Sequence, residues 1–227
     1  MPWRLPKSPS QNIPMDIHAR IAVFHSLTRE ERKCPDRHRA MASWLKTFIE
    51  DTPAVPVGYQ MLFLFSFYYG HDTEWSLIIA RDYYSRTRDH LAAILIAVME
   101  EEFRGGIGKK LYDLLTVIGG LSRDWEDICC FYRAMYLKKN ELPYEDMLLK
   151  VVGINEVYPR AWLELARLHD ADREKHNRYL NRALQQMSTV DYRDEHLFTI
   201  DYFLKEVAHL STASHMQLEY FRAQLKK

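Results

Sequence analysis

The residues Thr73–Gly106, TEWSLIIARDYYSRTRDHLAAILIAVMEEEFRGG, contain two amphipathic helical patterns in succession. In each pattern the apolar side chains recur every three or four residues, which places them on one face of a helix. A polar joint at Arg86–Asp89 separates the patterns, and Gly105-Gly106 ends the second, as glycine commonly does after a last helical turn. The stretch therefore predicts a helix hairpin of about one structural repeat.

Further helical patterns precede and follow this hairpin. We expect helices over residues 15–27, 36–50, 57–70, 108–121, 124–138, 143–152, 159–169, 170–187, 192–210 and 214–225. Glycine is scarce, with 8 among 227 residues. Scarce glycine and long helical patterns together predict an all-α fold of about 11–12 helices.

Alternate helices are expected to start at a regular spacing, near Asp36, Thr73, Ile107, Pro143 and Asp172. The spacing is roughly 29 to 37 residues, the range of helix-hairpin repeats. One hairpin cannot bury its own apolar face, so stacked hairpins would share a continuous core. We therefore predict stacked antiparallel helix hairpins, an α-solenoid, in one helical-repeat domain over residues 15–227. An extended tail with four prolines, residues 1–14, precedes it, and an irregular helical bundle is the alternative fold.

Composition limits the classes of binding partner and the cellular compartment that we expect. The chain has 31 basic and 31 acidic residues, so its formal net charge is zero and a protein-wide positive field is absent. Nucleic acid is therefore not an expected partner. Three cysteines, Cys34, Cys129 and Cys130, do not form a disulfide framework and fit a reducing compartment. With no apolar leader at the N-terminus, we expect a cytoplasmic protein.

A charge-free stretch of about 19 residues runs from Thr52 to Gly70, long enough to raise the question of a membrane span. Prolines, Gly58 and Gln60 shorten its continuous apolar part to Met61–Tyr69, which is too short to cross a bilayer. We therefore expect a helix buried on nearly all sides and no membrane span. A second use of this aromatic helix would be a subunit contact in a homo-oligomer.

Two places in the chain resemble tetratricopeptide repeats, a family of paired helices. In the first, Ile79-Ala80-x-x-Tyr83 is followed on the next helix by Ala92 and Ile96. In the second, Trp162-x-x-Leu165-Ala166 is similar to the family's first helix, with His169 where the family has tyrosine, and Phe131-x-x-Ala134 resembles the end of a second helix. The resemblance implies a concave groove, lined by first helices, that binds a peptide or protein segment.

The resemblance also implies which residues would line such a groove: Glu74, Arg81 and Tyr84 on one first helix, and Lys109, Tyr112 and Thr116 on the next. Basic side chains would bind a partner's carboxylates, and tyrosines would supply rigid contact area. We therefore predict an adaptor, scaffold or chaperone that binds another protein. It would have no catalytic residue, no bound metal and no cofactor. An ordinary solvated helix surface is the alternative for each residue.

The main alternative function is a metal-dependent hydrolase on a helical bundle. His169-Asp170 resembles the metal-binding pair of HD phosphohydrolases, and His71-Asp72 is a second such dipeptide. Histidine at a helix end followed by a capping aspartate explains the same residues without a metal. Glu206-x-x-His209 has the spacing of di-iron bundles but no second copy, and the glycines at 105–108 lack the spacing of a phosphate-binding loop.

Overall fold

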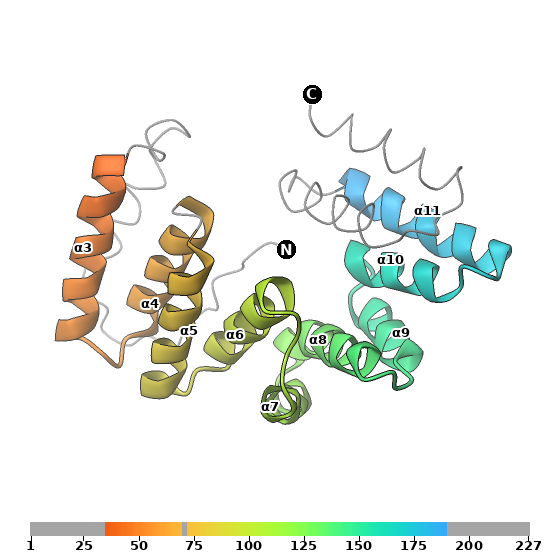
Figure 1. Cartoon of the computed structure of the whole chain (residues 1–227), viewed down its shortest axis with the longest axis horizontal. Helices are drawn as coiled ribbons and strands as arrows, with labels where there is room; N and C mark the ends of the chain where they lie inside the picture. The colour runs from red at the N-terminus through yellow and green to blue at the C-terminus, as the bar shows by residue number, and fades with distance from the viewer. Residues whose placement is uncertain (1–34, 70–71, 190–227) are drawn as a thin grey trace. The chain divides into compact units, whose positions relative to one another are not determined.

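The computed structural model describes residues 35–69 and 72–189, which form helices joined by short turns and contain no strand (Figure 1). The all-α prediction is confirmed for these residues. The predicted tail and the helices predicted over 15–27, 192–210 and 214–225 lie outside them. The helices are α3 (Pro35–Asp51), α4 (Pro56–Leu64), the π-helical turn η1 (Phe65–Tyr69), α5 (Thr73–Thr87), α6 (His90–Phe103), α7 (Lys109–Leu121), the 3₁₀ turn η2 (Arg123–Trp125), α8 (Glu126–Lys139), α9 (Glu145–Ile154), α10 (Pro159–Leu168) and α11 (Arg173–Thr189).

Helix starts agree with the predicted spacing. Alternate helices begin at Pro35, Thr73, Lys109, Glu145 and Arg173, each within two residues of the predicted start. Packing divides the described chain into two compact units, with the boundary between Leu114 and Leu115. Extensive packing joins α3 to α4, α4 to α5 and α5 to α6 in one unit, and α8 to α9, α9 to α10 and α10 to α11 in the other. We call the described residues up to Leu114 the N-terminal unit and the described residues from Leu115 the C-terminal unit; a single domain over 15–227 stays a prediction.

The core of the N-terminal unit contains α4 and α6. Every residue of Gly58–Phe63 is buried, and so is every residue of Leu91–Ala97. Gly58 permits close packing of α4 on α3, because a Cβ there would lie 2.8 Å from Cδ1 of Phe48. The expectation of a helix buried on nearly all sides is therefore confirmed. Among the described helices, none is long and apolar enough to cross a membrane.

Side chains at the start of the Met61–Tyr69 stretch are buried within a single chain. Met61, Leu62, Phe63 and Phe65 are each at most 5% exposed. The subunit contact that the sequence suggested for Met61–Tyr69 stays a prediction. The apolar helix also does not continue as one α-helix, because a π-helical turn follows α4 at Phe65.

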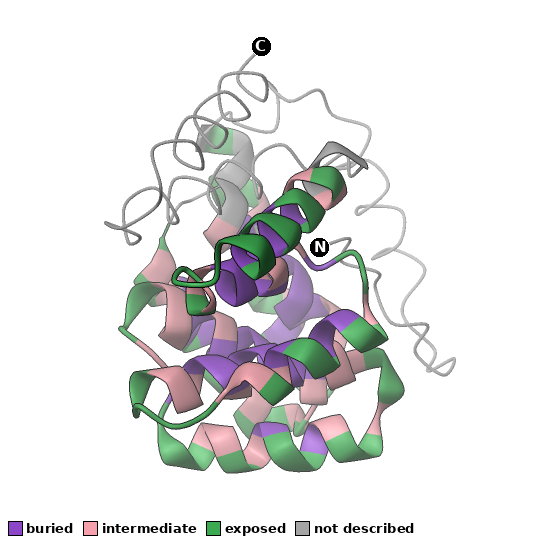
Figure 2. Cartoon of the chain, turned by 90° about the vertical axis from the view of Figure 1, so that its right-hand side faces the viewer, coloured by how far each residue is buried: buried purple, intermediate pink, exposed green. Residues whose placement is uncertain are grey.

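The core of the C-terminal unit is built from α8, α9, α10 and one side of α11. Buried residues lie where the helices face one another and exposed residues face outward (Figure 2). Cys129 and Cys130 are both buried free thiols and pack as small hydrophobic residues. Gly119 of α7 lies against α8, because a Cβ there would lie 3.1 Å from Cβ of Cys129.

Most residues that carry the family resemblance are buried. Ala80, Tyr83, Ala92, Phe131, Ala134, Leu165 and Ala166 have no exposed surface, and Ile79 and Ile96 are less than a tenth exposed. Small and large side chains thus alternate in the interior, as closely packed helix pairs require. Any tightly packed helical protein would meet that requirement, so the resemblance stays a prediction.

Candidate functional site

The hairpin predicted around Thr73–Gly106 is defined by two aspartate caps. The carboxylate of Asp72 accepts a hydrogen bond from the backbone N–H of Trp75 at 2.9 Å, at the start of α5. Asp89 does the same for Leu91 at 2.9 Å, at the start of α6. Between them Arg88 adopts a left-handed φ of 55°, a common way to end a helix. These signals fix where α5 begins and ends, and so hold its outer face in one position.

The outer face of α5 carries an exposed apolar side chain between two charges. Ile78 is 58% exposed, and the spacing of Glu74, Ile78 and Arg81 places all three on one side of the helix. Arg81 donates a hydrogen bond to Glu100 of α6 at 3.0 Å, and Glu74 pairs with Arg104, just after α6. Both ion pairs cross from α5 to the second helix of the hairpin. We call Glu74, Ile78 and Arg81 the α5 face.

The other predicted groove residues lie around this face or on α7. Tyr84 is half-buried on α5. At the start of α7, Nζ of Lys109 lies 2.7 Å from Asp113 and 4.7 Å from the ring centre of Tyr112. Thr116 is exposed on the same helix but belongs to the C-terminal unit. The structure thus brings Glu74 and Arg81 together on one helix, and places Lys109, Tyr112 and Thr116 along another.

Buried polar contacts join α5 to α4 and to the start of α6. The rings of Tyr59 on α4 and Tyr83 on α5 stack with centres 5.2 Å apart. Gln60 donates a hydrogen bond to Oη of Tyr83 at 2.8 Å, and Tyr83 donates to the capping carboxylate of Asp89. Burial, and then this bond to Asp89, raise the pKa of Tyr83 well above its usual range. One tyrosine therefore links α4, α5 and the start of α6.

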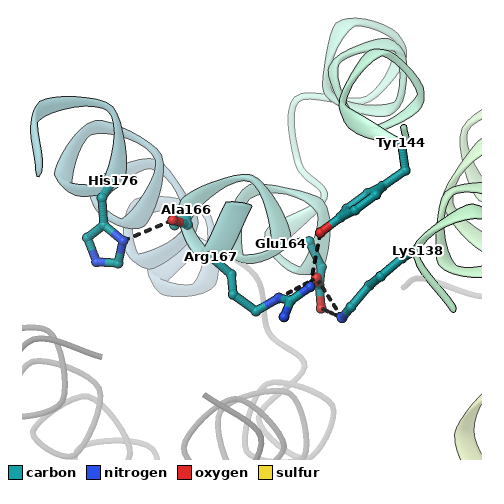
Figure 3. Close-up of polar contacts among 6 residues, drawn as sticks. All are labelled: Lys138, Tyr144, Glu164, Ala166, Arg167 and His176. Atoms are coloured by element: carbon teal, nitrogen blue, oxygen red, sulfur yellow. Dashed lines mark hydrogen bonds and ion pairs between the residues drawn. The ribbon is translucent and has the colours of Figure 1, made fainter. Parts of the chain in front are cut away.

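A second polar cluster, which sequence reasoning missed, surrounds Glu164 in the C-terminal unit (Figure 3). Glu164 is only 4% exposed. Nζ of Lys138, near the end of α8, lies 2.9 and 3.1 Å from its two carboxylate oxygens. Nε of Arg167 donates to the same carboxylate at 3.2 Å, and Nη2 of Arg167 donates to Oη of Tyr144 at 3.0 Å.

The Glu164 cluster is a neutralised buried charge. A buried carboxylate is costly unless cations and hydrogen bonds satisfy it, and here two cations do. Burial lowers the pKa of Arg167, but the negative charge of Glu164 and the contact with Tyr144 outweigh it, so the pKa is raised. Burial raises the pKa of Tyr144, against the opposing effect of Arg167. The cluster joins α8, the start of α9 and α10. Its role is therefore structural.

The predicted His-Asp pair does not converge on one point. Nε2 of His169 lies 2.7 Å from Oε1 of Glu145, whereas Asp170 lies 3.6 Å from Nδ1 of His176. Nδ1 of the buried His176 also lies 2.9 Å from the carbonyl oxygen of Ala166. Within residues 35–69 and 72–189, no three histidine, cysteine or acidic side chains are placed to hold a metal. His71 lies outside these ranges, so the hydrolase alternative stays an untested prediction.

Comparison of the chain with protein-family models, with curated proteins and with solved structures finds no match. Function must therefore be argued from the chain's own residues.

Proposed function

We propose that the chain is a protein-interaction module that binds a segment of another protein at the α5 face. The observation that supports this is Ile78, which is 58% exposed in the middle of a well-capped helix. Charged side chains of both signs, Glu74 and Arg81, lie beside it. An apolar contact bordered by polar groups is the usual composition of the centre of a binding surface.

The ion pairs across the hairpin make the α5 face suited to binding. Arg104 and Glu100 hold Glu74 and Arg81 in defined positions. Charged side chains that are already ordered lose less conformational entropy when a partner binds. The expected partner segment has one large apolar side chain to cover Ile78, with an acidic group toward Arg81 and a basic group toward Glu74.

In this proposal Tyr84, Lys109 and Tyr112, all in the N-terminal unit, extend the binding surface. The role predicted for Thr116, which belongs to the C-terminal unit, stays a prediction. Packing of α5 on α6, and of α8 on α9 and α10 on α11, supports a succession of helix hairpins within each unit. The proposed role is that of an adaptor, scaffold or chaperone in the cytoplasm, without catalysis, metal or cofactor.

Co-purification with substituted chains tests the proposal. We expect the tagged wild-type chain to retain one dominant polypeptide, and Ile78→Asp and Arg81→Glu each to reduce its recovery by about ten-fold. The matched control is Arg86→Glu, which changes an exposed arginine of the same helix that pairs with Asp82, away from the α5 face. The retained polypeptide is then purified and its binding measured directly. Equal binding to all four chains would contradict the proposal.

A further inference from the structure

An exposed serine lies at the C-terminal end of the α5 face. Ser85 follows Arg81 by four residues, and Arg88, the residue that caps the end of α5, follows Ser85 by three. Residues at this spacing are neighbours on one side of a helix. Oγ of Ser85 donates a hydrogen bond to the carbonyl oxygen of Asp82 at 2.8 Å. Ser85 therefore presents its hydroxyl on the helix surface between two arginines.

The two arginines beside Ser85 are held only by weak surface contacts. Arg81 donates a hydrogen bond to Glu100 at 3.0 Å, but its side chain is 58% exposed, and ion pairs at the surface contribute little. Arg88 has its guanidinium 5.3 Å from the ring centre of Tyr84. It makes no ion pair within the described part of the chain. Both guanidinium groups are therefore able to turn toward an anion on Ser85.

We propose that Ser85 is a phosphorylation site for a serine kinase that recognises arginine-rich segments. Arginines lie four residues before Ser85 and one and three residues after it, a charge pattern that an acidic substrate groove would recognise. In the reaction, Oγ of Ser85 bonds to the γ-phosphorus of ATP and the bond from that phosphorus to the ADP oxygen breaks. The hydroxyl proton passes to a base of the kinase, and ADP leaves.

Thr87, the nearest other hydroxyl, is less available for this reaction. It is half-buried, its hydroxyl donates to the carbonyl oxygen of Tyr83 at 2.8 Å, and it accepts a hydrogen bond from the N–H of Asp89 at 3.2 Å. Phosphorylation of Thr87 would disturb the turn that positions the cap of α6. Ser85 loses one bond to a carbonyl in the last turn of α5, where helices open most readily. The phosphate is therefore expected on Ser85 and not on Thr87.

A phosphate on Ser85 would change the charge of the α5 face by about −1.5 to −2 at pH 7. A helix C-terminus disfavours an anion, and Asp82 is a nearby acid, although Arg86 already pairs with it at 2.8 Å. Arg81 and Arg88 offset this cost, because guanidinium groups bind phosphate through two hydrogen bonds at once. Arg81 is then no longer available to the acidic group of a partner. This regulation rests on the proposed function, whereas phosphorylation of Ser85 and its arginine contacts do not.

Treatment of the purified full chain with ATP, Mg²⁺ and an arginine-directed serine kinase tests the site. Mass spectrometry of peptides should find phosphate on Ser85 and none there in Ser85→Ala, with incorporation about ten-fold slower in Arg81→Gln and Arg88→Gln. Arg104→Gln is the matched control, because Arg104 pairs with Glu74 at the other end of the α5 face, and it should react as the wild type does. No phosphate on Ser85, or phosphate only on the urea-unfolded chain, would overturn the proposal.

Phosphoserine incorporated at position 85 during translation tests the arginine contacts. We expect the folded chain to hold the second phosphate proton about three-fold more weakly than an unfolded peptide does, because two cations favour the dianion. Phosphorus NMR during a pH titration measures this difference, which should disappear in Arg81→Gln and Arg88→Gln and persist in Arg104→Gln. Titration as in the peptide would overturn the contacts.

Co-purification with the phosphoserine chain tests the regulation separately. Recovery of the partner polypeptide should fall about ten-fold relative to the unmodified chain, because like charges then meet at Arg81. Equal recovery would overturn the regulation. If the unmodified chain retains no partner, the proposed function fails and the regulation fails with it, whereas the phosphorylation and the titration still decide the site on their own.

Discussion

Gly119 and Gly120 are neighbours on α7 with different surroundings. A Cβ at Gly119 would lie 3.1 Å from Cβ of the buried Cys129, whereas a Cβ at Gly120 would meet nothing within 4 Å. Alanine within a helix is favoured over glycine by about 0.5–1 kcal/mol. We therefore expect Gly120→Ala to raise the free energy of unfolding by that amount, and Gly119→Ala to lower it because α8 must shift. Urea unfolding of the pair measures both, and an equal gain in both variants would show that α7 is not in close contact with α8.

Cys129 gives the fold a defined sensitivity to alkali. Burial raises the pKa of its thiol from 9.0 to about 12. The folded state therefore holds the proton more tightly than the unfolded state, so this contribution to stability is complete below pH 9 and is lost as the pH rises toward 12. We expect Cys129→Ala to flatten the fall of unfolding free energy between these pH values. The same burial should protect the thiol from alkylation at pH 8 in a Cys34→Ser background, and rapid alkylation of the folded chain would contradict it.

At the scale of the element, Asp89 has two tasks at once. It caps α6 through Leu91, and it accepts the hydrogen bond of the buried Tyr83. Asp72 caps α5, and loss of a helix cap alone costs about 1 kcal/mol. We expect Asp89→Ala to lower the free energy of unfolding by about 2–3 kcal/mol, because it also leaves a buried hydroxyl without its acceptor, and Asp72→Ala by about 1 kcal/mol. Thermal unfolding followed by circular dichroism ranks the two variants, and equal losses would show that the bond to Tyr83 contributes nothing.

Helix positions followed from the sequence because their signals are local. Proline at the first turn of α10, the joint before Asp89 and the apolar run in α4 can each be recognised within a few residues. The Glu164 cluster could not be predicted in this way. Its ion pair joins residues 26 positions apart in the chain, and only the packing of both α8 and α10 on α9 brings them together. The one local signal was an acid between Leu163 and Leu165 in a strongly amphipathic helix.

The sequence pattern also did not predict which side of α7 is exposed. Apolar residues on this helix cover more than one face, and periodicity alone does not say which of them meets a neighbour. The structure buries Leu115 and Ile118 and leaves Val117 and Leu121 in solvent. The α5 face shows the same limit, because Ile78 is one of three consecutive apolar residues, of which only Leu77 and Ile79 are buried. Contacts between helices, which the pattern does not contain, decide the exposure.

At the scale of the whole molecule, packing mainly between consecutive helices has a consequence for cooperativity. In such chains stability is spread over local interfaces, and one region can open while another stays folded. Glu164→Gln tests this in the C-terminal unit, because it leaves Lys138 and Arg167 without their carboxylate. Breaking a buried ion pair in this way costs about 3 kcal/mol. We expect amide hydrogen exchange to accelerate in α8, α9 and α10 and to change little in α4, α5 and α6.

The reciprocal variant makes the comparison decisive. Asp89→Ala weakens contacts among α4, α5 and α6, so it should accelerate exchange there and leave α8–α10 protected. Two opposite patterns of exchange would mean that the two compact units open independently, as stacked local interfaces allow. If either substitution accelerates exchange equally in both units, the chain unfolds as one cooperative domain. That result would favour a single closed bundle over a stacked array, and it would remove the support that the proposed binding surface draws from the stacked arrangement.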